Sequence, residues 1–375
     1  MTQRPLIFLT LLSCFLLMGG CAHQPKPLAI EESNAVSAPS LNTRPFEKQT
    51  LFDLMLGELA SKQGRMDLLL DQYVKQARYT KDPGIIERAL QIALYLKKYE
   101  VSAEMAQLWL NLKSEDRQTA NYAFFYLAQI AQAKKDQESA LTLYRKVQTG
   151  PFFHAAQLQS AALLADQGKL NEARTLLTSI RQQDPSVAAD FFAAEANLLI
   201  QNKHFTEADA LLTTALAQFP NHPELLYSHS IIAEKQQRWE VMEQDLRRII
   251  KLYPDNAVAL NALGYTLADR NQHLKEAQAF IQRAYQLNPN DPATMDSLGW
   301  VEYRLGHYTE AQAWLEKAYQ LWPDAEIAAH LGEVLWKNNQ REQAITIWKA
   351  ALKTNPQDDT LQKTLQQFHV DTTTP

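Results

Sequence analysis

Apolar side chains recur at spacings of three and four residues along most of the chain, which is the period of an α-helix. In residues 295–311 (MDSLGWVEYRLGHYTEA) this spacing is followed by Leu298, Val301, Leu305 and Tyr308. Gly299 lies in the middle of this pattern, although a glycine inside a helix costs about 1 kcal/mol relative to alanine. The position of Gly299 therefore needs a structural reason.

The same order of residues returns on either side of this stretch, with a period of 33 to 35 residues. A Leu-Gly pair comes first, at Leu263-Gly264, Leu298-Gly299 and Leu331-Gly332. Two alanines and a proline follow in each copy, namely Ala277, Ala284 and Pro289; Ala311, Ala318 and Pro323; and Ala344, Ala351 and Pro356. A generic helical bundle would explain the apolar spacing but not this fixed order.

A two-helix unit of about 34 residues with Leu-Gly early and Ala and Pro late resembles the tetratricopeptide repeat. The resemblance implies an all-α fold, a tetratricopeptide-repeat α-solenoid that forms a right-handed superhelix of helix-turn-helix units. In that family the glycine lies where the two antiparallel helices of one repeat approach closely, so a Cβ atom would push them apart. The alanines serve the same contact, and the proline ends the second helix.

Weaker copies of the pattern extend toward the N-terminus, with prolines again about 34 residues apart. We expect about nine such repeats in residues 49–356, of which 257–356 are the best formed. Residues 357–375 are expected to form a capping helix and a tail, because the end of a repeat stack needs a polar outer face.

The first residues have a different composition. One arginine precedes an apolar run that is too short for an ordinary membrane span, and Gly19-Gly20 stand before Cys21. Residues 1–20 thus resemble a bacterial lipoprotein signal peptide, which implies lipidation of Cys21. The alternative is a secretory signal cut elsewhere. Cys14 would be removed with the signal, so Cys21 would be the single cysteine of the mature chain.

Residues 21–48 contain the lipidated cysteine and a stretch rich in Pro, Ser, Asn and Ala, a composition typical of a flexible linker. Ala22 follows the cysteine. In the enteric lipoproteins that this segment resembles, an aspartate at that position is associated with retention in the inner membrane, and this chain lacks it. We therefore expect the protein at the outer membrane, lipid-anchored and facing the periplasm.

Charge and motifs exclude several functions. The chain has 37 basic and 42 acidic side chains, a net charge of −5, and no basic patch of the kind that binds nucleic acid. It lacks the local motifs of hydrolases, zinc enzymes and phosphate-binding loops. The nine histidines are scattered, and the carboxylates mostly accompany Lys or Arg as solvated charges. We expect no catalytic residues, metal or cofactor.

The concave groove of the family is the candidate binding site. Groove positions on the first helices of the last three repeats are occupied by Asn261, Tyr265, Asp269, Asp296, Trp300, Tyr303, Arg304, Glu333, Trp336 and Lys337. Aromatic side chains and arginine are enriched in protein interfaces, so these residues are predicted to bind a partner. The alternative is that Trp300 and Trp336 pack against the next repeat. The carboxylate clamp of chaperone-binding members is absent.

Residues 260–352 are further similar to tetratricopeptide lipoproteins of Gram-negative bacteria. That resemblance implies a non-catalytic adaptor for a periplasmic carboxy-terminal processing protease and its peptidoglycan-hydrolase substrates. The protein partners would then be the protease, the cell-wall hydrolases or both, with the membrane reached through the lipid anchor. The alternative is an assembly factor for outer-membrane proteins or a pilotin-like factor for a type IV pilus secretin.

Overall fold

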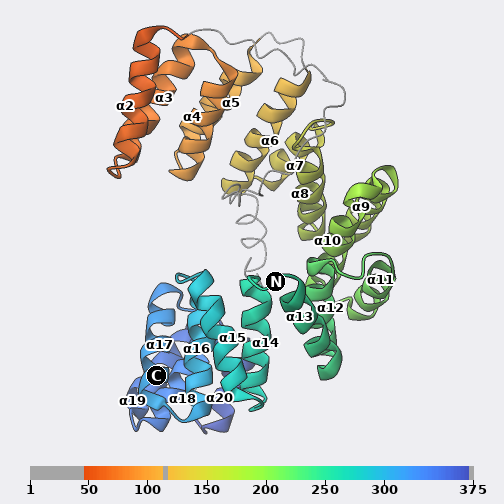
Figure 1. The fold of residues 1–375 in the computed structure, drawn as a ribbon, viewed down its shortest axis with the longest axis vertical. Helices are drawn as coiled ribbons and strands as arrows, with labels where there is room; N and C mark the ends of the chain where they lie inside the picture. Colours follow the sequence, from red (N-terminus) through yellow and green to blue (C-terminus); the bar gives the residue numbers. More distant parts are fainter. Residues whose placement is uncertain (1–45, 113–116, 371–375) are drawn as a thin grey trace, which may run out of the picture. The chain divides into compact units, whose positions relative to one another are not determined.

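The computed structural model describes residues 46–112 and 117–370. The chain divides into two compact units between Leu51 and Phe52, inside its first described helix. Apart from the first turn of that helix, the fold below is that of the second unit. The described residues form nineteen α-helices and one short 3-10 helix, without a strand (Figure 1). Among these residues no helix is both long and apolar enough to span a bilayer. The predicted signal peptide, Cys21 and the linker up to residue 45 lie outside the described residues.

Eighteen of the helices follow one another as nine pairs, each with a first and a second helix. The first five pairs are α2 (Lys48–Ser61) with α3 (Met66–Thr80), α4 (Pro83–Tyr95) with α5 (Tyr99–Leu110), α6 (Arg117–Ala133) with α7 (Gln137–Arg145), α8 (Phe153–Asp166) with α9 (Leu170–Gln183), and α10 (Ala188–Gln201) with α11 (Phe205–Gln218). The 3-10 helix η1 (Pro185–Val187) precedes α10.

The remaining four pairs and a last single helix complete the described chain. They are α12 (Pro223–Lys235) with α13 (Trp239–Leu252), α14 (Ala257–Asp269) with α15 (Leu274–Leu287), α16 (Pro292–Leu305) with α17 (Tyr308–Leu321), α18 (Ala325–Lys337) with α19 (Arg341–Thr354), and α20 (Asp359–Gln367). From α5 onward each second helix packs on its own first helix and on the first helix that follows it. α3 packs on α4, and its Leu69 lies beside Gly57 of α2. α20 packs on α18 and α19 and buries Leu361 and Leu365. The predicted all-α repeat architecture is confirmed.

Local sequence signals set the ends of these helices. The side chains of Asn256, Asp291 and Asp324 accept hydrogen bonds from backbone N–H groups in the first turns of α14, α16 and α18. Such N-caps satisfy donors that the helix itself leaves free. The second helices α15, α17 and α19 each end two residues before a proline of the repeat pattern, because the residue before a proline disfavours helical geometry.

The repeat glycines lie at close contacts between the two helices of a pair, as the pattern predicted. A Cβ atom on Gly264 would come within 2.5 Å of Ile281 Cγ1, and one on Gly299 would overlap Leu315 and lie 3.1 Å from the backbone oxygen of Ala311. At Gly332 the same atom would overlap the indole of Trp348. The three glycines therefore allow α14, α16 and α18 to approach their second helices.

We expect Gly299→Leu to lower the free energy of unfolding by about 1–3 kcal/mol, because overpacking forces side chains or backbone to shift. Thermal unfolding followed by circular dichroism measures the effect. Gly84→Leu is the control, since Gly84 is exposed in the first turn of α4. Equal melting temperatures for the two variants would show that the close contact at Gly299 is unimportant for stability.

Candidate functional site: the face of helices α14, α16 and α18

The predicted binding residues lie on three successive first helices. α14 contacts α16, and α16 contacts α18, so their side chains form one continuous face. α14 carries Asn261, Tyr265 and Asp269; α16 carries Asp296, Trp300, Tyr303 and Arg304; and α18 carries Glu333, Trp336 and Lys337. The structure thus brings these ten residues into one region, which we call the inner face. Their role in binding stays a prediction.

Trp300 is a packing residue at the base of the inner face. Its side chain is only 5% exposed, and its ring stacks on the imidazole of His330 with 4.1 Å between ring centroids. The indole Nε1 donates a hydrogen bond of 3.3 Å to Asp269 Oδ1. Trp300 therefore packs against the next repeat, which was the alternative to an exposed position in the groove. A ring this buried offers little surface to a partner, so the expectation of an exposed anchor is not met at this position.

Asp296 and His330 form a buried ion pair beside Trp300. They are 6% and 5% exposed, and His330 Nδ1 lies 3.0 Å from both carboxylate oxygens of Asp296. Burial alone would lower the pKa of His330, but the charge and hydrogen bond of Asp296 oppose it and raise that pKa to about 9. His330 is then an imidazolium at neutral pH. Asp296 is consequently a structural partner for α18 rather than a solvated groove carboxylate.

Tyrosines and carboxylates form the accessible rim of the inner face. The hydroxyl of Tyr265 donates to Glu326 Oε1 at 2.9 Å, and that of Tyr303 donates to Glu333 Oε1 at 2.7 Å. Arg304 donates from Nη2 to the backbone oxygen of Asp269 at 2.9 Å. The bonds of Tyr303 and Arg304 connect neighbouring first helices, and the bond of Tyr265 connects α14 with α18, two pairs further on. All three hold half-buried side chains in fixed positions. Sequence reasoning did not include Glu326, which pairs with Tyr265.

The part of the inner face that α18 contributes is less accessible to solvent than the pattern predicts. Trp336 is half-buried, because its ring packs against Trp348 and Phe368, with centroids 5.9 and 5.5 Å apart. Asn261 is also half-buried, whereas Lys337 is exposed. Trp336 therefore joins the last pair to the region of α20, and the surface available to a partner consists mainly of Tyr265, Tyr303 and the charged side chains around them.

Between pH 6.5 and about 9 we expect the wild-type protein to lose stability relative to His330→Gln. The pKa of His330 is higher in the folded state than its ordinary value of 6.5, so the stabilisation is complete below 6.5 and is lost as the pH rises through about 9. Urea denaturation of both proteins across this range measures the difference. Parallel pH profiles would contradict the buried ion pair.

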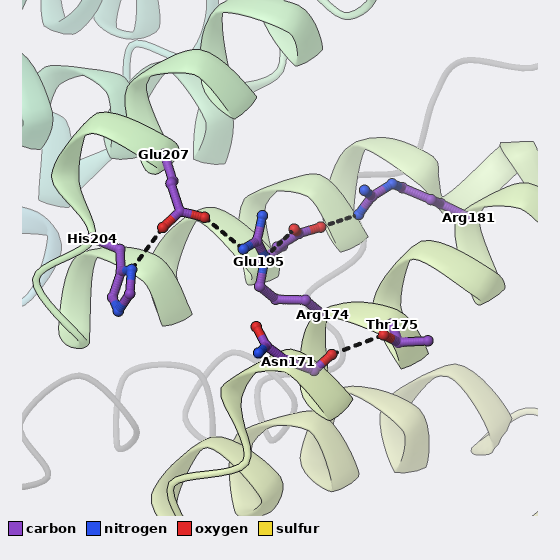
Figure 2. A network of polar contacts seen from close by, with 7 residues as sticks. All are labelled: Asn171, Arg174, Thr175, Arg181, Glu195, His204 and Glu207. Carbon is purple, nitrogen blue, oxygen red and sulfur yellow. Dashed lines mark hydrogen bonds and ion pairs between the residues drawn. The ribbon is translucent and has the colours of Figure 1, made fainter.

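A second polar cluster joins α9, α10 and α11 (Figure 2). Glu195 of α10 is 2% exposed and accepts hydrogen bonds from Arg174 Nε at 2.9 Å and Arg181 Nη1 at 2.5 Å. Arg174 also donates to Glu207, which contacts His204 at 2.7 Å. Both oxygens of Glu195 are thus engaged by guanidinium groups. The expectation that the carboxylates are mostly solvated is wrong for Glu195, whose position within the apolar run FFAAEANLLI was the available signal.

An open pocket of about 500 Å³ lies beside this cluster. It is lined by Arg174, Glu195 and a polar stripe of α9 that consists of Asn171, Thr175, Thr178, Ser179 and Gln182. The Thr175 hydroxyl donates to the backbone oxygen of Asn171, as shown in Figure 2. Because its one carboxylate is already bound by two arginines, the pocket has no general base to activate these hydroxyls.

One group of side chains has metal-ligand chemistry among the described residues, namely Asp190, His222 and Glu224. His222 Nε2 lies 3.2 Å from Asp190, and Nδ1 lies 3.3 Å from Glu224. The hydrogen bond to Asp190, together with both negative charges, raises the pKa of His222 against the effect of its burial. The contacts of His222 with the two carboxylates are contacts within the protein, and they account for this arrangement.

Comparison with known proteins agrees with the repeat pattern. Sequence models described as tetratricopeptide repeat match residues 164–230 and 302–367, and another model of the same description matches residues 232–292. Together these segments cover just over half of the chain. The chain belongs to the tetratricopeptide-repeat family. Proteins of this class are typically non-catalytic scaffolds that bind other proteins.

A relative in Pseudomonas aeruginosa, the TPR repeat-containing protein PA4667, is 41% identical over 211 residues. The match covers 56% of this chain and 36% of the relative, so the chain corresponds to about a third of that protein. Solved tetratricopeptide structures resemble the fold. One from Parabacteroides merdae has 19% identity, a TM-score of 0.49, and coverage of 66% of this chain and 98% of its own. One from Thermus thermophilus has 21% identity, a TM-score of 0.44, and coverage of 49% and 100%.

Proposed function

We propose that this protein is a lipid-anchored adaptor of the outer membrane whose repeats face the periplasm and bind a carboxy-terminal processing protease together with its peptidoglycan-hydrolase substrates. The observation that supports binding most directly is the inner face, where Tyr265 and Tyr303 are held at the surface by two carboxylates of α18. Rigid aromatic side chains give a partner contact area at a low cost in conformational entropy.

The proposed location rests on the sequence before the repeats. An apolar segment ends at Gly19-Gly20-Cys21, and about 27 residues of linker composition separate the cysteine from the first helix. A coil of that length reaches on the order of 30 Å. An anchored scaffold that binds both proteins would raise their effective concentration toward each other without contributing chemistry of its own.

Site-specific photo-crosslinking in intact cells tests the partner. A photo-crosslinking residue at Lys337, which is exposed on the inner face, should capture a protease of the carboxy-terminal processing class. The same residue at Leu321, which is 56% exposed at the end of the second helix α17, is the control. Capture of the protease at neither position, or only at Leu321, would contradict the proposed site.

Fractionation of Cys21→Ser tests the anchor separately. The variant should fold normally but leave the outer-membrane fraction, because it lacks the acceptor for lipid. The wild-type protein and an Ala22→Ser variant, which keeps the cysteine, are the controls. A Cys21→Ser protein that remains in the outer membrane would show that another element holds it there, and would leave the result of the crosslinking experiment unaffected.

A further inference from the structure

The first described helix, α2, has one buried side and one exposed apolar side. The buried side carries Thr50, Asp53, Gly57 and Ala60. The other side is exposed: Phe52, Met55 and Leu59 are 61%, 56% and 57% exposed, and they are flanked by Leu51 and Leu56. In a soluble protein the apolar stripe of a helix normally faces the core.

The register of the repeats shows what usually covers this side. Phe52 and Leu59 correspond to Ile85 and Ile92 in the next pair, 33 residues further on, which are only 5% and 4% exposed. Each first helix from α4 onward is packed against the second helix of the preceding pair. The exposed side of α2 is therefore built as a surface on which another helix stacks.

The third pair shows the same contact in detail. Tyr122 and Tyr126 occupy the positions of Leu51 and Met55, 71 residues further on when the turns after the first helices are aligned. Their rings lie 5.4 and 6.1 Å from the ring of Trp109, which belongs to the preceding second helix α5. Within the described part of the chain no helix pair precedes α2, so Leu51 and Met55 have no equivalent of Trp109.

The two ends of the described stack differ in this respect. At the C-terminal end, α20 covers α18 and α19 and buries Leu361 and Leu365, while its sequence DTLQKTLQQ is otherwise mostly polar. Such a helix is a cap that keeps the end of a repeat stack soluble. The N-terminal end carries instead a contiguous apolar patch on α2.

We propose that α2 of a second copy of this chain covers the patch, so that two stacks join end to end through their first helices. The five apolar side chains expose roughly 500 Å² per copy, and a symmetric pair would bury about 1,000 Å², the lower limit for a specific interface. Because each copy has one such end and the same patch serves both partners, the contact closes as a dimer and does not continue into a filament.

Disulfide trapping in the full chain tests this dimer. Met55→Cys places a thiol at the centre of the patch, and Tyr95→Cys places one at a 75% exposed position at the end of α4. After mild oxidation, non-reducing electrophoresis should show a band at twice the chain mass for Met55→Cys. Neither Tyr95→Cys nor the unsubstituted chain under the same oxidation should give that band.

A substitution that introduces a charge into the patch provides a second test of the dimer. Adding Leu59→Glu to Met55→Cys should reduce the dimer band at least about tenfold, because burying an unpaired carboxylate costs more than the 1.4 kcal/mol that corresponds to this factor. Leu59 is exposed, so the variant should keep its circular dichroism spectrum. Absence of the band, equal trapping in Tyr95→Cys, or a conjugate with a different protein would overturn the proposal. None of these outcomes depends on the lipid anchor or on the proposed protease.

Discussion

Trp300→Ala is expected to lower the free energy of unfolding by about 3–5 kcal/mol, the usual range for removing a buried tryptophan. The ring is 5% exposed and lies between Tyr303, at 5.1 Å between centroids, and His330, at 4.1 Å. Its removal leaves a cavity between α16 and α18 and admits water to the Asp296–His330 pair. Trp300→Phe keeps a stacked ring and should cost less than the alanine variant.

Hydrogen exchange shows where the loss is located. In a repeat stack each pair contacts mainly its neighbours, so stability is close to a sum of local contributions. Backbone amides of α16 and α18 should exchange faster in Trp300→Ala, while those of α8 and α9 should remain as in the wild type. An unchanged melting temperature with weakened partner binding would instead show that Trp300 acts as an exposed anchor, as the groove pattern predicted.

Glu195→Ala is the second change with a large expected effect, again about 3–5 kcal/mol, because it leaves two guanidinium groups without their buried carboxylate. Arg181 is the more affected of the two, since its side chain is 12% exposed and Glu195 accepts its short hydrogen bond. Arg174 keeps Glu207 as a partner. The contact between α9 and α10 should therefore loosen first.

Glu207→Ala is the matched control for this cluster. Glu207 also binds Arg174, but its side chain is 48% exposed, and ion pairs of that kind contribute roughly 0–1 kcal/mol. Urea denaturation of both variants compares a buried with an exposed carboxylate in one network. If the two changes cost the same, the burial of Glu195 is not what makes the cluster stabilising.

The repeat pattern carried most of the information about the fold. Leu-Gly, the two alanines and the proline follow from the need to bring two helices together within one repeat, and this contact is local in sequence. Gly299 and Leu315 are sixteen residues apart and meet inside one pair, and the prolines mark helix ends without any tertiary contact. The order of elements could therefore be predicted from residues close to one another in the chain.

The candidate site was predictable only as a set of positions. Register placed ten residues on three first helices, and the structure brings them together on the inner face. Register could not tell which of them would be accessible, because this depends on partners about one repeat away. Tyr303 pairs with Glu333, thirty residues on, and remains half-buried. Trp300 is instead covered by His330, which is also thirty residues further along the chain.

Sequence alone thus determined the all-α repeat architecture, the helix ends and the reason for the glycines, since these depend on helical period, capping and contacts within one unit. Only the tertiary structure decided that Glu195, Asp296 and His330 are buried ion-pair residues, that Trp300 packs rather than projects, and that α2 has an exposed apolar side. The physical reason is that burial of a side chain is a property of its neighbours in space. In a repeat stack those neighbours come from the preceding or the following unit. The sequence period predicts that the side chains of these units are near, but it does not specify which of them make contact.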